Sequence, residues 1–163
     1  MTRDFKWAQD FKCAHCHGYV SGEPLLSGVR NRNHCPYCLW SRHLDLYQSG
    51  DRLSACKAGM QPVGLTLKIT WKKYRFNEGG ELMLIHECIE CQSLSINRIA
   101  ADDDAERIFD LFEGSLEMGD NKKAQLAAIG VIPLAVADRA TVSTRLFGSM
   151  ENVLFNYTEA LWD

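Results

Sequence analysis

Residues 31–45 read N-R-N-H-C-P-Y-C-L-W-S-R-H-L-D, and this stretch decides the fold. It places two cysteines, Cys35 and Cys38, two residues apart among arginine, asparagine and histidine side chains. A C-x-x-C pair of this kind can be a redox centre or one half of a metal site. The basic and amide side chains beside it also suit a nucleic-acid contact. The rest of the chain has to decide among these three interpretations.

The C-x-x-C spacing occurs three times in this chain. The pairs are Cys13/Cys16, Cys35/Cys38 and Cys88/Cys91, and Cys56 stands alone. Two thiolates from one tight turn can bind the same ion at the zinc–sulfur distance, and two such turns complete a tetrahedron. Three pairs therefore predict zinc. Seven cysteines are one ligand short of two four-coordinate sites, so a histidine is expected to supply the eighth.

His43 and His86 are the candidates for this eighth ligand, because the other histidines lie inside or beside a C-x-x-C pair. The sequence after Cys38 predicts a helix, on which His43 would lie about 140° round from Cys38, at roughly 100° per residue. The two side chains would then point at different ions. The predicted ligands are Cys13, Cys16, Cys35 and Cys38 for site one, and His43, Cys56, Cys88 and Cys91 for site two.

Two alternatives to this assignment stay open. His86 competes with His43 in site two, and the first and third C-x-x-C pairs can share an ion instead of the first and second. In each arrangement four protein ligands saturate the ion. A catalytic zinc keeps a position for water or substrate, so saturated sites indicate structural zinc. Two structural zinc ions are thus the expected cofactors, and their binding contributes to folding.

Between and after the cysteines the sequence predicts a β-hairpin and then helices. Residues 65–76 alternate apolar and polar side chains as a half-buried strand does, Asn-Glu-Gly-Gly at 77–80 suits a turn, and residues 82–85 return. Aspartates at 102–104 can cap a helix over residues 106–118, and further helices are expected at 122–129 and 149–157. The predicted fold class is small α+β, a zinc-ribbon-like β-hairpin domain with two structural zinc sites plus a C-terminal helical extension.

The net charge of −3 is unevenly distributed. Residues 1–100 carry 13 Lys and Arg against 9 Asp and Glu, whereas the last 63 residues carry 5 against 12. We therefore predict a zinc-binding domain at residues 1–101 and an acidic helical extension at residues 102–163. The apolar stretch 126–137 should be buried against the zinc domain or another chain, because an exposed patch of this kind aggregates. The C-terminal helices are accordingly a candidate surface for a protein partner or a homodimer.

The chain contains no run of 18 apolar residues, so no membrane contact is expected. Its first twelve residues, MTRDFKWAQDFK, lack the apolar stretch of a signal peptide. Seven cysteines without secretion call for a reduced, metal-bound state rather than disulfides. The sequence therefore predicts a cytoplasmic protein.

Five stretches of the chain together resemble the RNHCP-domain family, which is named for the string at residues 32–36. They are F-K-C-A-H-C at 11–16, the string R-N-H-C-P-Y-C-L-W-S-R-H-L-D at 32–45, G-D-R-L-S-A-C-K-A-G-M-Q-P at 50–62, H-E-C-I-E-C at 86–91 and N-R-I-A-A-D-D at 97–103. His17 and Gln92 depart from the glycine that zinc knuckles often carry after the second cysteine. The resemblance implies a zinc-ribbon-like domain and brings no biochemical activity with it.

Enzymatic alternatives fit the residues less well. C-P-Y-C is the active-site string of glutaredoxins, but that chemistry needs a buried parallel strand before the motif and a helix after it, and residues 30–34 are polar. A zinc deaminase needs H-x-E and P-C-x-x-C, whereas here Pro36 lies inside the pair and no H-x-E occurs. A zinc hydrolase would need an open metal site. The sequence therefore favours a protein that is not an enzyme.

Nucleic-acid binding is the most specific functional hypothesis from sequence. Metal-held turns can present arginine and asparagine to RNA phosphates or unpaired bases, as in a ribosome contact, while Tyr37 or Trp40 stacks. The candidate contacts are Arg30, Arg32, Asn33, His34, Arg42 and Arg98. Two alternatives remain: Arg32, Asn33 and Asn97 hydrogen-bond loop backbones, or the domain is a structural or protein-interaction module.

Overall fold

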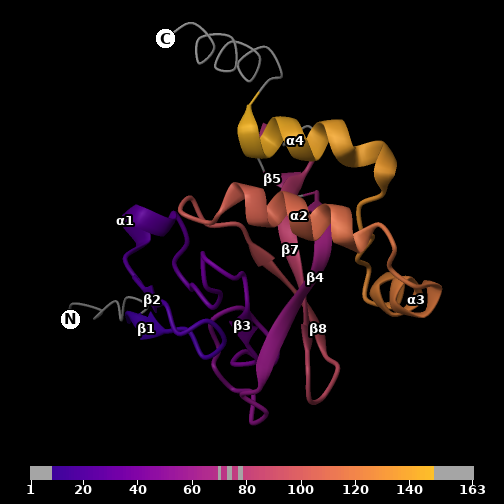
Figure 1. Cartoon of the computed structure of the whole chain (residues 1–163). Helices are drawn as coiled ribbons and strands as arrows, with labels where there is room; N and C mark the ends of the chain where they lie inside the picture. The colour runs from indigo at the N-terminus through magenta and orange to yellow at the C-terminus, as the bar shows by residue number, and fades with distance from the viewer. Residues whose placement is uncertain (1–8, 70, 73–74, 77–78, 149–163) are drawn as a thin grey trace, which may run out of the picture.

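A computed structural model describes residues 9–69, 71–72, 75–76 and 79–148, and Figure 1 labels its helices and strands. The centre of the fold is an antiparallel sheet in the order β3-β4-β7-β8. Its strands are β3 (Ser41–Arg42), β4 (Gly59–Lys68), β7 (Glu81–Cys88) and β8 (Leu94–Arg98). The long β4–β7 hairpin pairs Leu65 with Leu84 and ends at Lys68 and Glu81. The predicted hairpin and the small α+β fold class are confirmed.

The first predicted strand of that hairpin has different limits. It begins at Gly59, six residues early, and leaves the main sheet after Lys68. The remaining alternating residues form a separate two-stranded sheet, in which β5 (Trp71–Lys72) pairs with β6 (Arg75–Phe76). An alternating pattern indicates that a segment is extended but not which strand it pairs with. The single predicted strand therefore corresponds to three strands, β4, β5 and β6.

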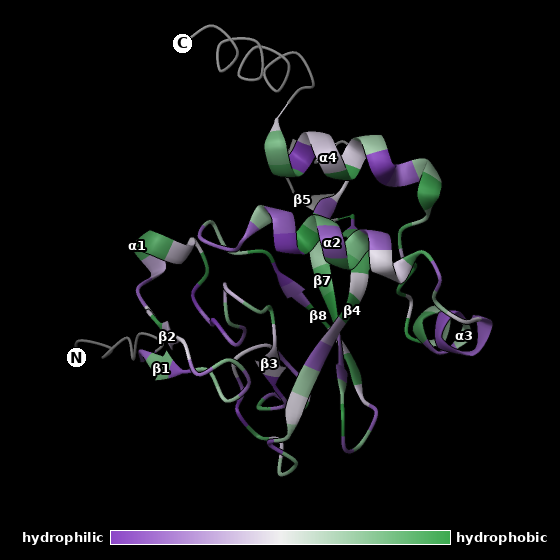
Figure 2. Ribbon diagram, in the orientation of Figure 1, coloured by the Kyte–Doolittle hydropathy of each residue, from purple (hydrophilic) through white to green (hydrophobic). Residues whose placement is uncertain are grey.

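Both faces of the central hairpin are covered, so it is not half-exposed as predicted. On one face Leu65 and Leu84 pack with Ile108 and Phe112 of α2 (Ala105–Ser115) and with Val142 of α4 (Arg139–Phe147). Figure 2 shows the hydrophobic residues of β7 running beneath α2. The other face is closed by α3 (Asp120–Ala128), in a cluster made of Ile85, Leu126 and Val131 with partly buried neighbours.

The helix α2 begins as the sequence predicts. The Asp104 carboxylate accepts the backbone N–H of Arg107 at 3.1 Å and caps the helix. Near its other end, Ser115 lies so close to β4 that a Cβ on Gly64 would be 3.2 Å from the Ser115 Cβ. Glycine at position 64 thus allows α2 to pack closely on the hairpin. The helix predicted at 122–129 corresponds to α3, α4 was not predicted, and residues 149–157 lie outside the described part of the chain.

The apolar stretch 126–137 covers an edge of β4. The Thr66 hydroxyl donates to the Ile132 carbonyl at 2.7 Å, and the Leu134 N–H donates to the Leu65 carbonyl at 2.9 Å. Leu126, Val131 and Leu134 are buried, as expected, whereas Ile129, Ile132 and Val136 are more than half exposed. The stretch protects a strand edge that would otherwise present unpaired backbone groups, so the acidic extension packs onto the hairpin. The division into two domains at residue 102 stays a prediction.

The amino-terminal part lies beside the hairpin and contains little regular structure (Figure 1). Its elements are β1 (Phe11–Lys12), β2 (Tyr19–Val20) and the one-turn helix α1 (Pro24–Ser27). A short 3₁₀ helix, η1 (Val136–Asp138), lies outside this part and directly precedes α4. The helix predicted after Cys38 is wrong. Leu39 has a left-handed φ of 63°, and the chain then pairs Ser41 with Met60 as β3. Among the described residues, no helix is both long and apolar enough to cross a membrane.

Candidate metal centres

The three C-x-x-C pairs fold into the same local structure. In each, the first cysteine's carbonyl accepts the N–H of the residue four positions on, and its N–H donates to the carbonyl five positions on, at 2.8–3.0 Å. The residue after each second cysteine has a left-handed φ of 60–63°; these residues are His17, Leu39 and Gln92. A side chain in this conformation costs about 1–2 kcal/mol. All three turns incur this cost, and an ion bound by the cysteines would offset it.

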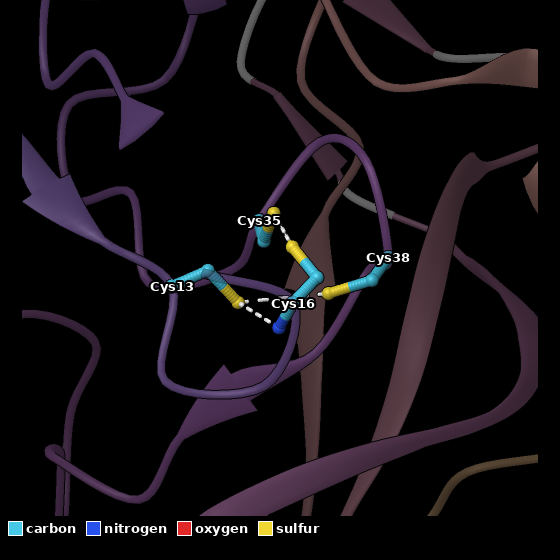
Figure 3. A group of neighbouring side chains, drawn as sticks. All are labelled: Cys13, Cys16, Cys35 and Cys38. Carbon is cyan, nitrogen blue, oxygen red and sulfur yellow. Dashed lines mark hydrogen bonds between the residues drawn. The ribbon is translucent and has the colours of Figure 1, made fainter. Parts of the chain in front are cut away.

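Site one gathers four sulfur atoms from the first two turns (Figure 3). Cys13 Sγ lies 3.6 Å from Cys38 Sγ, and Cys16 Sγ lies 3.6 Å from Cys35 Sγ. All four sulfur atoms are within 4.8 Å of one another. A tetrahedral zinc with Zn–S bonds of about 2.3 Å requires sulfur–sulfur separations near 3.8 Å, whereas a disulfide requires about 2.05 Å. The arrangement therefore suits a metal ion and not a disulfide.

Site two gathers His43, Cys56, Cys88 and Cys91 in the same way. Cys56 Sγ lies 3.6 Å from Cys88 Sγ, and His43 Nδ1 lies 3.3 Å from Cys91 Sγ. The two clusters are the groupings expected from the sequence, and the exchanged pairing does not occur. The reason is not the predicted helix. The His43 N–H donates to the Ala58 carbonyl, and the Lys57 N–H donates to the His43 carbonyl, so backbone pairing holds His43 next to Cys56.

In a comparison with known protein families, residues 8–109 match a family model described as the RNHCP domain. The chain belongs to this family. Neither the curated proteins nor the solved structures gave a match. The matched residues of this RNHCP domain include both cysteine clusters and the whole β4–β7 hairpin, and they end inside α2.

His86, the alternative eighth ligand, forms two buried hydrogen bonds in the RNHCP domain and lies in neither cluster. Its ring is fully buried, its Nε2 lies 2.7 Å from the Leu39 carbonyl, and its Nδ1 lies 2.9 Å from Asn97 Nδ2. Because the carbonyl must accept and the amide NH₂ must donate, Nε2 carries the proton and Nδ1 is the acceptor. Burial lowers the pKa of His86 to about 4, so the ring is neutral at pH 7. His86 thus ties β7 to the second C-x-x-C turn without reaching either cluster.

Each cluster combines thiols whose pKa is raised by burial with an exposed thiol whose pKa is lowered, Cys16 in site one and Cys91 in site two. Burial raises the pKa of Cys35 to about 11 and also raises that of Cys38. In site two, hydrogen bonds from the Ser93 side chain and backbone lower the pKa of the exposed Cys91 to about 6. A glutaredoxin-type nucleophile needs a lowered pKa and an accessible sulfur. Cys35, with a raised pKa and no exposed surface, has neither property.

The arginine and histidine of the R-N-H-C-P string form a buried polar network. Arg32 pairs with Asp102 at 2.7 Å and with Asp103 at 3.1 Å, and His34 Nε2 lies 2.7 Å from Asp103 Oδ2. The Arg32 and Asp103 side chains have no exposed surface. The network joins the second C-x-x-C turn to the segment that begins α2, and the Asp104 N–H reinforces it by donating to the Pro36 carbonyl.

This network corrects part of the predicted nucleic-acid surface. Arg32 and His34 are only 2% exposed, so neither can contact a partner. Arg98 is exposed, but Glu81 holds its guanidinium at 2.8 and 3.2 Å. The Asn33 amide donates to Asp45 at 2.9 Å. Arg30 and Arg42 remain exposed, although two nitrogens of Arg42 donate to the Lys57 carbonyl. The alternative that Arg32, Asn33 and Asn97 hydrogen-bond loop backbones holds for Arg32, whose Nε donates to the His34 carbonyl at 3.2 Å. The Asn33 and Asn97 amides instead bond to the side chains of Asp45 and His86.

Sequence reasoning missed the aspartates that shape residues 45–53. Asp51 accepts four backbone N–H groups at 2.8–3.1 Å, from residues 46, 47, 48 and 53, and these hold its pKa well below the usual range. Asp45 accepts the N–H groups of Gly50 and Arg52. The loop is therefore ordered by carboxylates in place of secondary structure. In the sequence, the only indication of this loop structure is that the two aspartates, Asp45 and Asp51, flank Gly50.

His43 and His86 give a direct test of the ligand assignment. We expect His43→Ala to bind one metal ion fewer than the wild-type chain, because site two loses a quarter of its ligands. His86→Gln should keep both ions and lose stability, and His17→Ala, an exposed histidine outside both clusters, should change neither. Metal content by elemental analysis after purification measures the first quantity. Full metal content in His43→Ala together with a loss in His86→Gln would reverse the assignment.

Proposed function

We propose that this RNHCP domain is a non-enzymatic zinc-binding module that contacts RNA through the face between its two metal clusters. Zinc is supported by the donor set: seven thiols and one imidazole in two tetrahedral groups suit zinc, whose structural sites use these ligands. Each cluster offers four protein ligands, which leaves no position for a substrate. The clusters therefore serve to hold loops in place, and function has to be sought on the surface that the loops form.

One observation carries the RNA proposal: a cleft of about 900 Å³ lies between the first C-x-x-C turn, β3 and the 45–53 loop. Four cationic side chains line it: Lys12, Arg42 and Arg52 are exposed, whereas Arg32 is buried in its ion pairs with Asp102 and Asp103. In the described part of the chain, no carboxylate pairs with Lys12 or Arg42, and Asp45 approaches Arg52 only to 3.9 Å. A groove lined by cations next to aromatic side chains is the arrangement by which proteins bind single-stranded nucleic acid. This surface replaces the predicted one centred on Arg32 and His34.

The test is salt-dependent binding to a short single-stranded RNA. We expect the affinity to fall as salt rises, with a log–log slope of about −0.7 per phosphate contacted. A Lys12→Ala/Arg42→Ala/Arg52→Ala variant should bind at least tenfold more weakly and show a shallower slope. The control is Arg107→Ala/Lys123→Ala, which removes exposed cations from α2 and α3. Equal loss in both variants, or no binding by the wild-type chain at low salt, would contradict the proposal. Fluorescence anisotropy measures these affinities.

A protein-interaction module is the second candidate. The carboxylate-ordered loop exposes Leu46, Tyr47 and Leu53, by 50%, 82% and 61% respectively. A rigid loop that presents apolar and aromatic side chains is typical of protein interfaces. If this surface is the functional one, Tyr47→Ala should abolish capture of a specific protein partner, and that capture should be insensitive to salt.

A further inference from the structure

The cleft is lined by a stacked pair of aromatic rings as well as by cations. His15 and Trp40 both line it, and their rings stack with centroids 4.2 Å apart and planes 5° from parallel. Trp40 also packs closely on Gly59, because a Cβ at that position would be 3.3 Å from Trp40 Cζ3. His15 is the exposed member of the stack. The pair therefore forms a fixed planar platform whose outer ring is open to a further planar group.

The remaining walls match the other parts of a nucleotide. Apolar side chains of Phe11, Leu44 and Ile89 line the cleft, and the exposed amide of Asn31 stands at its side. Among the described lining residues, Asp10 is the one carboxylate, and its Oδ1 already accepts the Gly22 N–H at 2.8 Å. A volume of about 900 Å³ lies within the usual range for a ligand pocket. A planar ring, an apolar wall, an amide and cations together suit a nucleobase with its phosphate.

We infer that the cleft holds one unpaired nucleotide of the RNA, with the base stacked on the His15–Trp40 pair and its phosphates near Lys12, Arg42 and Arg52. This inference rests on the proposed function and deepens it, because it replaces general attraction to phosphate with a defined base pocket. An acidic peptide would satisfy the three cations but would leave the stacked platform and the apolar wall without a matching group. The position of His15 inside the first C-x-x-C turn fixes the platform through site one.

Three RNA heptamers with the same phosphates test this inference on the full chain with metal bound. One carries seven adenines, one carries a single central adenine among abasic riboses, and one is fully abasic. A stacked base contributes about 1–3 kcal/mol. The single-base heptamer should therefore bind about five- to 150-fold more tightly than the fully abasic one, and within about threefold of the seven-adenine strand.

Variants of the platform separate stacking from charge. His15→Ala should reduce the affinity for the single-base heptamer to that for the abasic one and leave the abasic affinity unchanged. His17→Ala, four residues from Cys13 and outside the cleft, is the matched control. Because Trp40→Ala removes a packed side chain, it is interpreted only if its circular dichroism and metal content match those of the wild-type chain.

The possible failures differ in meaning. If all three heptamers bind equally and His15→Ala has no effect, the base pocket is wrong while phosphate contact stands. If the seven-adenine strand binds tightly but the single-base strand binds like the abasic one, several bases are contacted and the single-nucleotide pocket is wrong. If no heptamer binds at low salt and an acidic peptide does, both the pocket and the RNA function are wrong.

Discussion

A Cys35→Ser variant is expected to bind one metal ion fewer than the wild-type chain and to lose the fold of its amino-terminal part. Cys35 is fully buried, and its cluster packs with Val20 and Phe11 as a separate small core. Residues 9–40 contain two two-residue strands and a single helical turn, so regular structure contributes little to their stability. A structural zinc contributes about 10–16 kcal/mol in zinc-finger peptides, against a net stability of about 5–15 kcal/mol for a typical domain.

The measurement combines metal analysis with thermal unfolding and amide hydrogen exchange. Cys91→Ser is the informative comparison, because Cys91 is an exposed ligand of site two whereas Cys35 is a buried ligand of site one. Both variants should lose one ion, but only Cys35→Ser should lose exchange protection throughout residues 9–40. A chelator should likewise remove the ion of site two first, because Cys56 and Cys91 are exposed. Two bound ions in Cys35→Ser would refute the assignment of site one.

An Asp103→Asn substitution should destabilise the chain by about 3–5 kcal/mol, the usual cost of removing one partner from a buried ion pair. Asp103 faces Arg32 and His34, and its carboxylate also accepts the Ala100 N–H at 2.7 Å. Without its charge, the fully buried Arg32 keeps only the partly exposed Asp102 as an ionic partner. Denaturant unfolding of the metal-loaded chain measures the loss.

The exposed pair between Arg98 and Glu81 is a matched control for this substitution. Two Arg98 nitrogens donate to Glu81, whereas Arg32 divides its guanidinium between Asp102 and Asp103, and the Arg98 and Glu81 side chains are 55% and 31% exposed. Glu81→Gln should therefore cost only about 0–1 kcal/mol. A double Arg32→Met/Asp103→Leu variant should recover stability relative to Asp103→Asn, because no charge is left buried without a partner. Equal losses in Asp103→Asn and Glu81→Gln would show that the buried network contributes no more than a surface pair.

The metal clusters could be predicted from the sequence because ligand counting restricts the possibilities severely. Seven cysteines and one histidine fill two tetrahedra, and few groupings satisfy the spacing. His43 was nevertheless placed by a wrong argument: the predicted helix is a strand, and pairing with residues 57 and 58 brings His43 to Cys56. The assignment of ligands to the two sites was therefore correct because of the number of available ligands, not because of the predicted helix.

The polar network could not be predicted from the sequence. Arg32 has the properties of a surface residue, since arginine is seldom fully buried without a partner. Its partners are Asp102 and Asp103, 70 and 71 positions further along the chain, and no local sequence pattern predicts such a contact. The same aspartates were interpreted as a helix cap, which is true of Asp104 alone. Local patterns predicted the turns and caps, whereas the use of charges in the interior depended on contacts between distant segments.

The hydrogen bond between His86 and the Leu39 carbonyl joins the segments that carry the two candidate metal sites. Leu39 belongs to a turn that holds one ion, and His86 lies two residues before Cys88, a ligand of the other. An ion that orders the Leu39 turn also fixes the carbonyl that accepts from His86, and this hydrogen bond helps to order the segment that carries Cys88. Affinities linked in this way are reciprocal: whatever free energy occupancy of the first site adds to the second, occupancy of the second adds to the first. Occupancy of one centre is therefore expected to raise the metal affinity of the other, so a variant that loses one ion should hold the remaining ion more weakly.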